Sequence, residues 1–307
     1  MDVLIARDAP ADLVALRRAA YDFAMPLNAQ AILAHPFADI EQVLDDKACM
    51  LFALSIGVGS DPTDLAELPY VFEEELQAFP TLPIVLGHPG PWMANPAMGI
   101  DRQMLVHGTQ RLELHAPLRP GAPFVARNRI LELVDKGADS GAIIVTERTL
   151  CDKASGALLA RIESGTFCRA DGGFGGQRDL SHDFKPVPDR AADQECRMPT
   201  QPNQALWYRL NGDRNPLHAS PAFAARAGFP RPILHGLCTY SVAAHALMKM
   251  AGAAARLRSI ESRFTKPVFP GETIRVQAWN EPHGMAFRAH VDARQAVVLD
   301  RGLATFA

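Results

Sequence analysis

Thr265-Lys266-Pro267-Val268-Phe269-Pro270-Gly271 has a counterpart earlier in the chain, His115-Ala116-Pro117-Leu118-Arg119-Pro120-Gly121. A second pair, Pro83-Ile84-Val85-Leu86-Gly87 and Pro232-Ile233-Leu234-His235-Gly236, occurs in the same order at nearly the same spacing of about 150 residues. Two pairs of similar segments with nearly the same separation indicate an internal repeat, and therefore two similar structural units. The alternative interpretation is that these are unrelated turns that happen to share proline and glycine.

Extended segments follow each of the two Pro-Gly turns. They lie at residues 124–134, 142–151 and 158–168 in the first half and at residues 273–279, 286–291 and 297–306 in the second. The separators in the first half are rich in Gly, Asp and Lys, as turns are. Ile274, Val276 and Ala278 alternate with polar residues, as in a strand with one buried face. Each half is therefore predicted to end in a three-stranded antiparallel meander.

A helix is predicted before the second meander, because residues 236–255 are apolar and rich in small side chains. A helix that is apolar nearly all round is buried. One buried helix wrapped by an antiparallel sheet is a hotdog unit, so the repeat predicts an α+β double hotdog with a long helix in each unit. The N-terminal unit is placed at residues 1–178 and the C-terminal unit at 179–307. A polar linker at residues 171–204 joins them, and residues 1–32 are predicted to be an appended helical segment.

The helix of the first unit should begin near residues 87–96, but this stretch contains three prolines and two glycines. These residues are incompatible with a regular helix, so a shorter and looser segment is expected there. The vacated space would form an apolar tunnel lined by side chains such as Trp92, Met93 and Met98. The alternative is that the stretch is only a surface loop.

The strongest local signal is Tyr208-Arg209-Leu210-Asn211-Gly212-Asp213-Arg214-Asn215-Pro216-Leu217-His218. Pro216 prevents a continuous helix, so a turn can direct Asp213 and His218 toward one point. A carboxylate beside an imidazole can hold one water molecule and shuttle its protons. Asn215 can bond the water or orient Asp213. Taken alone, the stretch would also suit an ordinary turn.

Gly236 is the candidate oxyanion donor, because it opens the predicted helix. The free N–H groups and the dipole at a helix N-terminus favour negative charge, and glycine lets a ligand approach the backbone closely. The preceding His235 is either structural or faces the same ligand.

The motif at Asp213 resembles the Gly-Asp-x-Asn-Pro-aliphatic-His signature of the hydratase 2 family, the MaoC-like enoyl-CoA hydratases. Further matches at residues 54–59, 172–176, 232–239 and 266–271 extend the resemblance over nearly the whole chain. The likeness is greatest to the two-unit hydratase of multifunctional β-oxidation proteins. Asn211 and Arg214 depart from the family pattern, which usually has a small residue and an aromatic residue at these positions.

The resemblance implies reversible addition of water to a trans-2-enoyl thioester, giving an (R)-3-hydroxyacyl thioester. Asp213 and His218 would be the acid/base pair, and only one active site is expected because the first unit lacks the motif. The family also implies a glutamate from the degenerate unit near this pair. It aligns with Glu73, or with a neighbouring glutamate, although a solvated acidic run is equally compatible. The residues predicted to contact the substrate are Arg214, His235, Tyr208, Trp92 and Met93.

Composition narrows the possible partners. The net charge of -3 and the absence of a basic block argue against a nucleic-acid surface. The five cysteines form no C-x-x-C pair, which favours a reducing, cytoplasmic setting, and no apolar run is long enough to span a membrane.

No histidine pair has the helical spacing of a metal site. We therefore expect no metal and no cofactor, with CoA entering only as part of the acyl-thioester substrate, and we expect a homodimer. Two alternatives stay open on the same fold: a thioesterase, and a non-catalytic protein that binds acyl thioesters.

Overall fold

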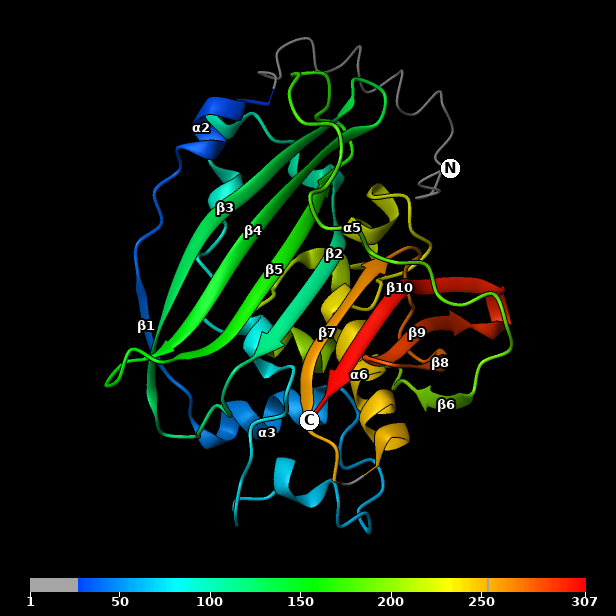
Figure 1. The fold of residues 1–307 in the computed structure, drawn as a ribbon. Coiled ribbons are helices and arrows are strands. Elements are labelled where there is room, and N and C mark those ends of the chain that lie inside the picture. The colour runs from blue at the N-terminus through cyan, green and yellow to red at the C-terminus, as the bar shows by residue number, and fades with distance from the viewer. Residues whose placement is uncertain (1–26, 253) are drawn as a thin grey trace.

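The computed structural model describes residues 27–252 and 254–307, and one ten-stranded antiparallel sheet organises them (Figure 1). The strand order is β1-β3-β4-β5-β2-β7-β10-β9-β8-β6. The strands are β1 (Ile40–Val43), β2 (Leu105–Leu114), β3 (Pro123–Gly137), β4 (Gly141–Asp152), β5 (Leu158–Cys168), β6 (Gln194–Pro199), β7 (Leu257–Phe264), β8 (Thr273–Glu281), β9 (Gly284–Val291) and β10 (Ala296–Phe306).

From the centre outward, one half-sheet runs β2-β5-β4-β3-β1 and the other runs β7-β10-β9-β8-β6, so each half has a central strand, a three-stranded meander and an edge strand. This correspondence confirms the predicted pair of similar units. The meanders β3-β4-β5 and β8-β9-β10 are the predicted ones, each with its flanking turns. The two central strands, β2 and β7, were not predicted from the sequence; they pair antiparallel with Leu112 opposite Ile260. This pairing joins the two half-sheets into one, and no turn connects the two strands to mark them locally.

Short helices surround one long helix on the face of the sheet that lies behind it in Figure 1. The α-helices are α2 (Ala29–Leu33), α3 (Asp46–Ser55), α4 (Gln204–Tyr208), α5 (Pro221–Arg226) and α6 (Gly236–Ala251). The 3-10 helices are η1 (Leu68–Tyr70), η2 (Leu82–Val85), η3 (Trp92–Ala94), η4 (Pro96–Met98), η5 (Arg102–Met104), η6 (Arg209–Asn211), η7 (Pro216–His218) and η8 (Asp292–Arg294). None of the helices in the described ranges is long and apolar enough to cross a membrane.

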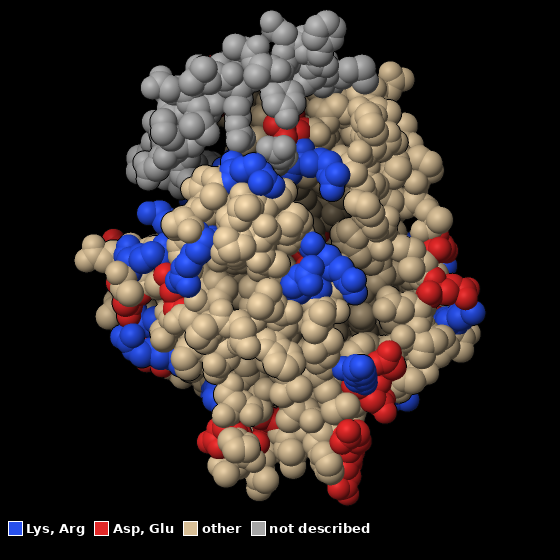
Figure 2. All heavy atoms as spheres, turned by 180° about the vertical axis from the view of Figure 1, so that it is seen from behind, with Lys and Arg blue, Asp and Glu red and all other residues tan. Residues whose placement is uncertain are grey.

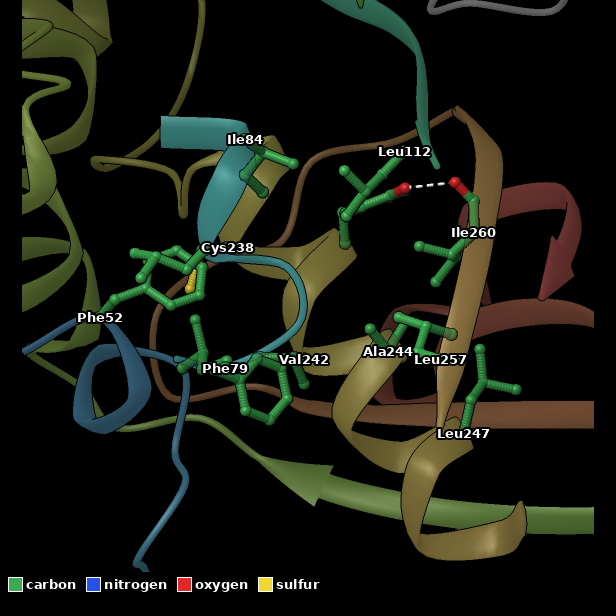
Figure 3. Close-up of a cluster of buried hydrophobic side chains, with 14 of the residues drawn as sticks. Phe52, Phe79, Ile84, Leu112, Cys238, Val242, Ala244, Leu247, Leu257 and Ile260 are labelled. Atoms are coloured by element: carbon green, nitrogen blue, oxygen red, sulfur yellow. Dashed lines mark hydrogen bonds between the residues drawn. The ribbon is translucent and has the colours of Figure 1, made fainter. Parts of the chain in front are cut away.

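Helix α6 is the predicted buried helix, and ten of its residues are buried. It ends four residues before the expected position because Gly252 follows with φ 93°, which breaks the helical path. Figure 3 shows α6 packed against the end of α3, with Phe52 and Phe79 close to Cys238 and Val242. The Tyr240 hydroxyl donates to the carbonyl of Ile260 at 2.5 Å and ties α6 to the central strand β7.

The prediction of a long helix in each unit is wrong for the first unit. The chain between residues 87 and 104 forms only the short 3-10 helices η3, η4 and η5. Proline explains the difference, since each one removes a backbone donor and clashes with the preceding turn of a helix. Helix α3 and η2 contribute to the core of this unit instead.

The predicted linker is also partly wrong, because Gln194–Pro199 forms the edge strand β6 on β8. The glycine-rich stretch at residues 172–176, at the start of this predicted linker, is held in place by Asp135. The carboxylate of Asp135 accepts hydrogen bonds from the backbone N–H groups of Gly137, Gly173 and Gly175 at 2.8, 2.8 and 2.5 Å. A Cβ at Gly172 would lie only 2.1 Å from the Gly137 carbonyl oxygen, so this close approach requires glycine.

Candidate active site

The candidate catalytic turn, residues 212–218, follows η6, and two backbone features shape it. Gly212 has φ 116°, a left-handed conformation that reverses the chain after η6. Asn215 then caps η7, because its Oδ1 accepts the N–H of Leu217 at 3.0 Å. The N–H of Asn215 donates to Asp213 Oδ1 at 3.1 Å. Asn215 therefore organises the turn and orients the carboxylate, one of the two tasks predicted for it.

His218 is buried at the end of this turn, and its tautomer follows from its partner. Its Nδ1 lies 2.9 Å from the carbonyl oxygen of Ile233, which can only accept, so Nδ1 carries the proton. The Nε2 atom is then the free basic nitrogen. Burial lowers the pKa of His218, although Asp213 and the Ile233 carbonyl oppose this shift. The ring is therefore neutral at neutral pH.

His235 stacks on His218, with ring centroids 3.6 Å apart and an interplanar angle of 25°. Its Nε2 donates to the backbone carbonyl of Asp213 at 3.2 Å. Burial and the His218 ring lower the pKa of His235 to about 3, against the opposing charge of Asp213. Tyr208 is fully buried behind it, at 4.9 Å between ring centroids. In this structure His235 and Tyr208 support the catalytic turn, and their contact with substrate stays a prediction.

Asp213 is the exposed member of the cluster. One ligand atom from each of Asp213, His218 and His235 lies within 4.8 Å of the others. Burial alone would raise the pKa of Asp213, but the two imidazoles and the Asn215 N–H lower it below its usual range. Two groups that bind the same water molecule lie roughly 4.5 Å apart. The separation therefore suits one water held between carboxylate and imidazole.

The same three residues are also a geometric candidate for a metal site. A metal ion would need each ring nitrogen to point at it from roughly 2 Å, in the plane of its ring. The planes of His218 and His235 are nearly parallel, so their lone pairs do not converge on one ion without ring rotation. The stacking favours water chemistry over metal binding.

Gly236 begins α6 beside this cluster, as predicted. The first N–H groups of the helix have no acceptor within it, and the positive end of the helix dipole lies there. A Cβ at Gly236 would lie 3.2 Å from Phe264 Cε1 and 3.6 Å from His107 Cβ. A larger residue at this position would therefore press against the Phe264 ring and the His107 side chain.

Two histidines of the first unit that the sequence did not indicate, His88 and His107, interact electrostatically with Asp213. Burial lowers the pKa of His107, on β2, while the charge of Asp213 opposes the shift. Burial and Arg148 lower the pKa of His88, in the loop after η2, to about 4, and Asp213 opposes here too. Both histidines thus lie within the electrostatic reach of the catalytic carboxylate. Neither sits in a recognised motif, and the pairing of β2 with β7 brings His107 toward the second unit.

The predicted residue Glu73 lies on an exposed turn. No hydrogen bond of the described part of the chain joins it to Asp213 or His218, and its proposed catalytic role stays a prediction. Arg214 is exposed beside Asp213. Trp92 and Met93 are half-buried at a second apolar cluster, where Trp92 stacks on His35 at 5.2 Å.

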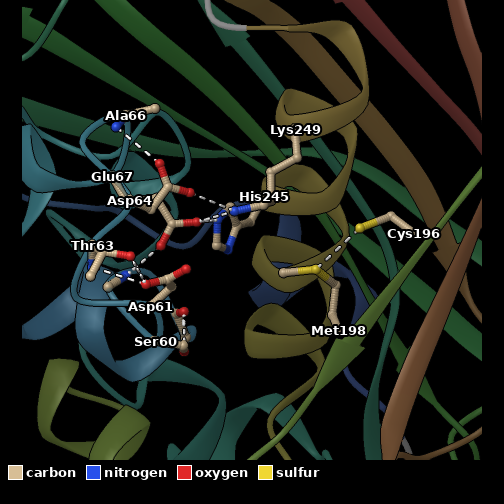
Figure 4. Close-up of polar contacts among 12 residues, drawn as sticks. Ser60, Asp61, Thr63, Asp64, Ala66, Glu67, Cys196, Met198, His245 and Lys249 are labelled. Carbon is tan, nitrogen blue, oxygen red and sulfur yellow. Dashed lines mark hydrogen bonds and ion pairs between the residues drawn. The ribbon is translucent and has the colours of Figure 1, made fainter.

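A different glutamate of the first unit reaches α6. Glu67 Oε1 accepts hydrogen bonds from His245 Nε2 at 2.7 Å and Lys249 Nζ at 2.5 Å (Figure 4). Its Oε2 accepts the N–H of Gly59 at 2.6 Å. Burial alone would raise the pKa of Glu67, but these donors outweigh it and lower the pKa to about 2. The interaction holds the loop between α3 and η2 against the middle of α6.

Both halves of the chain match models of known protein families. The family model described as "MaoC like domain" matches residues 183–299, and the model described as "MFE-2 hydratase 2 N-terminal domain" matches residues 43–170. The 3-hydroxyacyl-thioester dehydratase Y of Mycobacterium tuberculosis is 40% identical over 84% of this chain and 91% of its own length. The chain belongs to the MaoC-like dehydratase family.

Other MaoC-like proteins extend the match. The peroxisomal enoyl-CoA hydratase 2 of Arabidopsis thaliana is 34% identical over 89% of this chain and 93% of its own length. The crystal structure of a MaoC-like dehydratase from Phytophthora capsici superposes with a TM-score of 0.79 and 33% identity, covering 92% of this chain and 99% of that one. The two-unit MaoC-like architecture therefore extends over nearly the whole chain, as the internal repeat predicted.

Proposed function

We propose that this chain is a hydro-lyase that adds water reversibly to trans-2-enoyl-CoA thioesters and gives (R)-3-hydroxyacyl-CoA products. The observation that carries the proposal is the placement of Asp213 and His218 with ligand atoms within 4.8 Å of each other, beside the N-terminus of α6. The names of the relatives, an enoyl-CoA hydratase and a 3-hydroxyacyl-thioester dehydratase, support the same reaction class.

The geometry supports a single acid–base cycle. The enoyl thioester lies with its carbonyl oxygen at the Gly236 N–H, which stabilises the negative charge that develops there. The water held between Asp213 and His218 adds through its oxygen to the β-carbon while the pair accepts one of its protons. The pair then gives one proton to the α-carbon, so it returns to its starting state. This chemistry needs no redox group, and CoA enters only as part of the substrate.

The test is hydration of trans-2-enoyl-CoA substrates, followed as loss of the absorbance of the conjugated double bond. Chiral analysis of the product should find the (R) isomer. Release of free CoA thiol without loss of unsaturation would indicate a thioesterase instead. Saturable binding with no turnover would indicate a non-catalytic acyl-thioester binding protein. An (S) product would contradict the proposed stereochemistry.

Recognition of CoA is supported by charge. The face seen in Figure 2 is hollowed, and Lys and Arg side chains flank the hollow. Such side chains suit the phosphate groups of CoA. Arg214, exposed beside Asp213, is our candidate for contact at the mouth of the site. Measuring KM for CoA thioesters at rising ionic strength tests this idea, since screening should raise KM.

We also propose a cytoplasmic homodimer. Five free cysteines, three of them buried, support a reducing compartment. Leu206, Trp207 and Leu210 expose about half of their surface on α4 and η6, which supports a contact between copies. Light scattering of the wild type and of Trp207→Ser tests the dimer, and a monomeric wild type would contradict it.

A further inference from the structure

Ser55 is a fully buried residue at the C-terminal end of α3, in the unit that lacks the catalytic motif. Its hydroxyl donates to the carbonyl of Phe52 at 2.7 Å. The lone pairs of the same oxygen accept a hydrogen bond from Asn211 Nδ2 at 2.9 Å. The hydroxyl therefore has a defined donor and acceptor role, and one of its partners belongs to the other unit.

Asn211 directly precedes Gly212 and Asp213. Its Nδ2 also donates to the carbonyl of Tyr208 at 2.9 Å, so both amide hydrogens are used. Asn211 is one of the two positions where this chain departs from the family motif. Because Asn211 has a longer side chain than the usual small residue, its amide reaches Ser55 from the start of the candidate catalytic turn.

The backbone carbonyl of Ser55 makes a second contact, with the opposite side of the site. It accepts the thiol of Cys238 at a sulfur–oxygen distance of 3.7 Å. Cys238 lies in the first turn of α6, two residues after Gly236, and its sulfur also accepts from Gln204 Nε2 at 3.7 Å. One residue of the degenerate unit thus contacts both the turn that carries Asp213 and the helix that begins at Gly236.

We propose that Ser55 and Asn211 form a positioning pair through which the degenerate unit sets the placement of Asp213 relative to Gly236. This inference rests on the proposed hydratase function. Hydrogen bonds of Asn215 and His218 hold the later part of the turn, whereas its start reverses at Gly212, directly after Asn211. A misplacement of about 1 Å at a reacting group can lower the rate by about 100-fold. A buried hydrogen bond between units restrains such movement.

The experiment is a double-mutant cycle with Ser55→Ala, Asn211→Ala and the double variant. Ser164→Ala is the matched control, because its hydroxyl also makes a part-buried side-chain hydrogen bond, to Gln110 at 2.8 Å, within the sheet. We expect each single variant to lower kcat about fivefold to tenfold, the effect of losing one hydrogen bond. KM should change by less than about twofold, and the double variant should be no worse than the worse single one.

Hydrogen exchange gives a second readout that does not need activity. Exchange of the backbone N–H groups of residues 212–218 should increase in Ser55→Ala and Asn211→Ala but not in Ser164→Ala. Unchanged kcat in the folded variants, multiplicative losses in the double variant, or unchanged exchange would each overturn the positioning role. If the wild type lacked hydratase activity, the proposed function would fail, and the exchange measurement would still decide whether the pair restrains the turn.

Discussion

At the scale of single residues, the hydrogen bonds of the candidate catalytic turn determine which polar groups are left free to react. Asn215 is occupied with the turn itself, through Leu217 and Asp213. His218 donates a hydrogen bond from Nδ1 to the Ile233 carbonyl. The carboxylate of Asp213 and the Nε2 of His218 are thus the groups positioned to exchange protons with a water molecule between them.

Replacing Asp213 with Asn, or His218 with Gln, should therefore lower kcat by at least about 100-fold, because each change removes a proton acceptor. Both replacements are close in size to the original, so thermal unfolding should shift little. Steady-state hydration kinetics check the prediction, with exposed His283→Gln as the control. Wild-type turnover in both variants would exclude the mechanism.

The pH profile of kcat/KM should reflect the lowered pKa of His218. Burial depresses this pKa below 6.5, so the ring accepts a proton only at a more acidic pH than an exposed histidine. Activity should stay level from neutral pH down to below 6.5 and then fall. Initial rates measured across this range test the prediction. An acidic limb centred above 6.5 would show that the ring is not buried in the active state.

At the scale of elements, α6 connects the two parts of the site. Its first turn presents Gly236 to the cluster, and its middle is held by Glu67 of the first unit through His245 and Lys249. The helix is buried nearly all round, so its position is set by packing and by these polar contacts together.

Gly236→Ala should lower kcat by about 100-fold, the usual effect of impairing one oxyanion donor. The added methyl group would lie against Phe264 and His107 and crowd the place of the thioester oxygen. Alanine favours a helix more than glycine does, so stability should not fall. Kinetics and thermal unfolding separate the two effects. Ala251→Gly, at the other end of α6, is the control and should lower stability with little change in kcat.

Glu67→Gln should weaken the fold at neutral pH by about 1 to 2 kcal/mol, since it removes the carboxylate that binds His245 and Lys249, while the Lys249 side chain stays partly exposed to solvent. The folded-state pKa of Glu67, about 2, is below the usual value of 4.5 for this side chain. Its stabilising contribution is thus complete above pH 4.5 and is lost as the pH falls toward 2.

Chemical unfolding at several pH values checks this. The wild type should lose stability steeply between about pH 4.5 and 2, and Glu67→Gln should lose less over the same interval. Glu74→Gln, at an exposed position, is the control and should follow the wild type. Equal slopes for wild type and Glu67→Gln would contradict the contribution assigned to this carboxylate.

At the scale of the whole molecule, two units with one repeated strand pattern differ in their helices and in the residues they bring to the candidate site. The second keeps the long helix and the catalytic motif. The first has short 3-10 helices where that helix would be, and a separate apolar cluster there includes Met98, Ile144 and Leu133. It also contributes His88 and His107 near Asp213 and Ser55 beneath the catalytic turn.

The first unit is predicted to admit an extended or bulky acyl chain, because its segment at residues 87–104 forms no long helix. kcat/KM should rise from short to long trans-2-enoyl-CoA substrates, because added apolar surface is buried in the protein. Met93→Trp should reduce kcat/KM for long chains and leave short chains nearly unchanged. A preference of the wild type for the shortest substrate would mean that no acyl tunnel passes through this unit.

The sequence by itself determined the two three-stranded meanders, the helix at Gly236 and the turn that carries Asp213 and His218. These features depend on local signals: alternation, small apolar runs, proline in a turn, and residues a few positions apart. The absence of a long α-helix at residues 87–96 could also be predicted from the sequence, because proline acts on the backbone of its own segment.

Only the tertiary structure decided which distant residues complete the site. β2 and β7 pair across about half of the chain, and this pairing brings His107 to Asp213. The hydrogen bond of Ser55 to Asn211 spans 156 residues, and that of Glu67 to His245 spans 178. Such contacts follow from how two half-sheets and one helix pack together. A single residue carries no local pattern that reports its distant neighbours, so the sequence could not assign them.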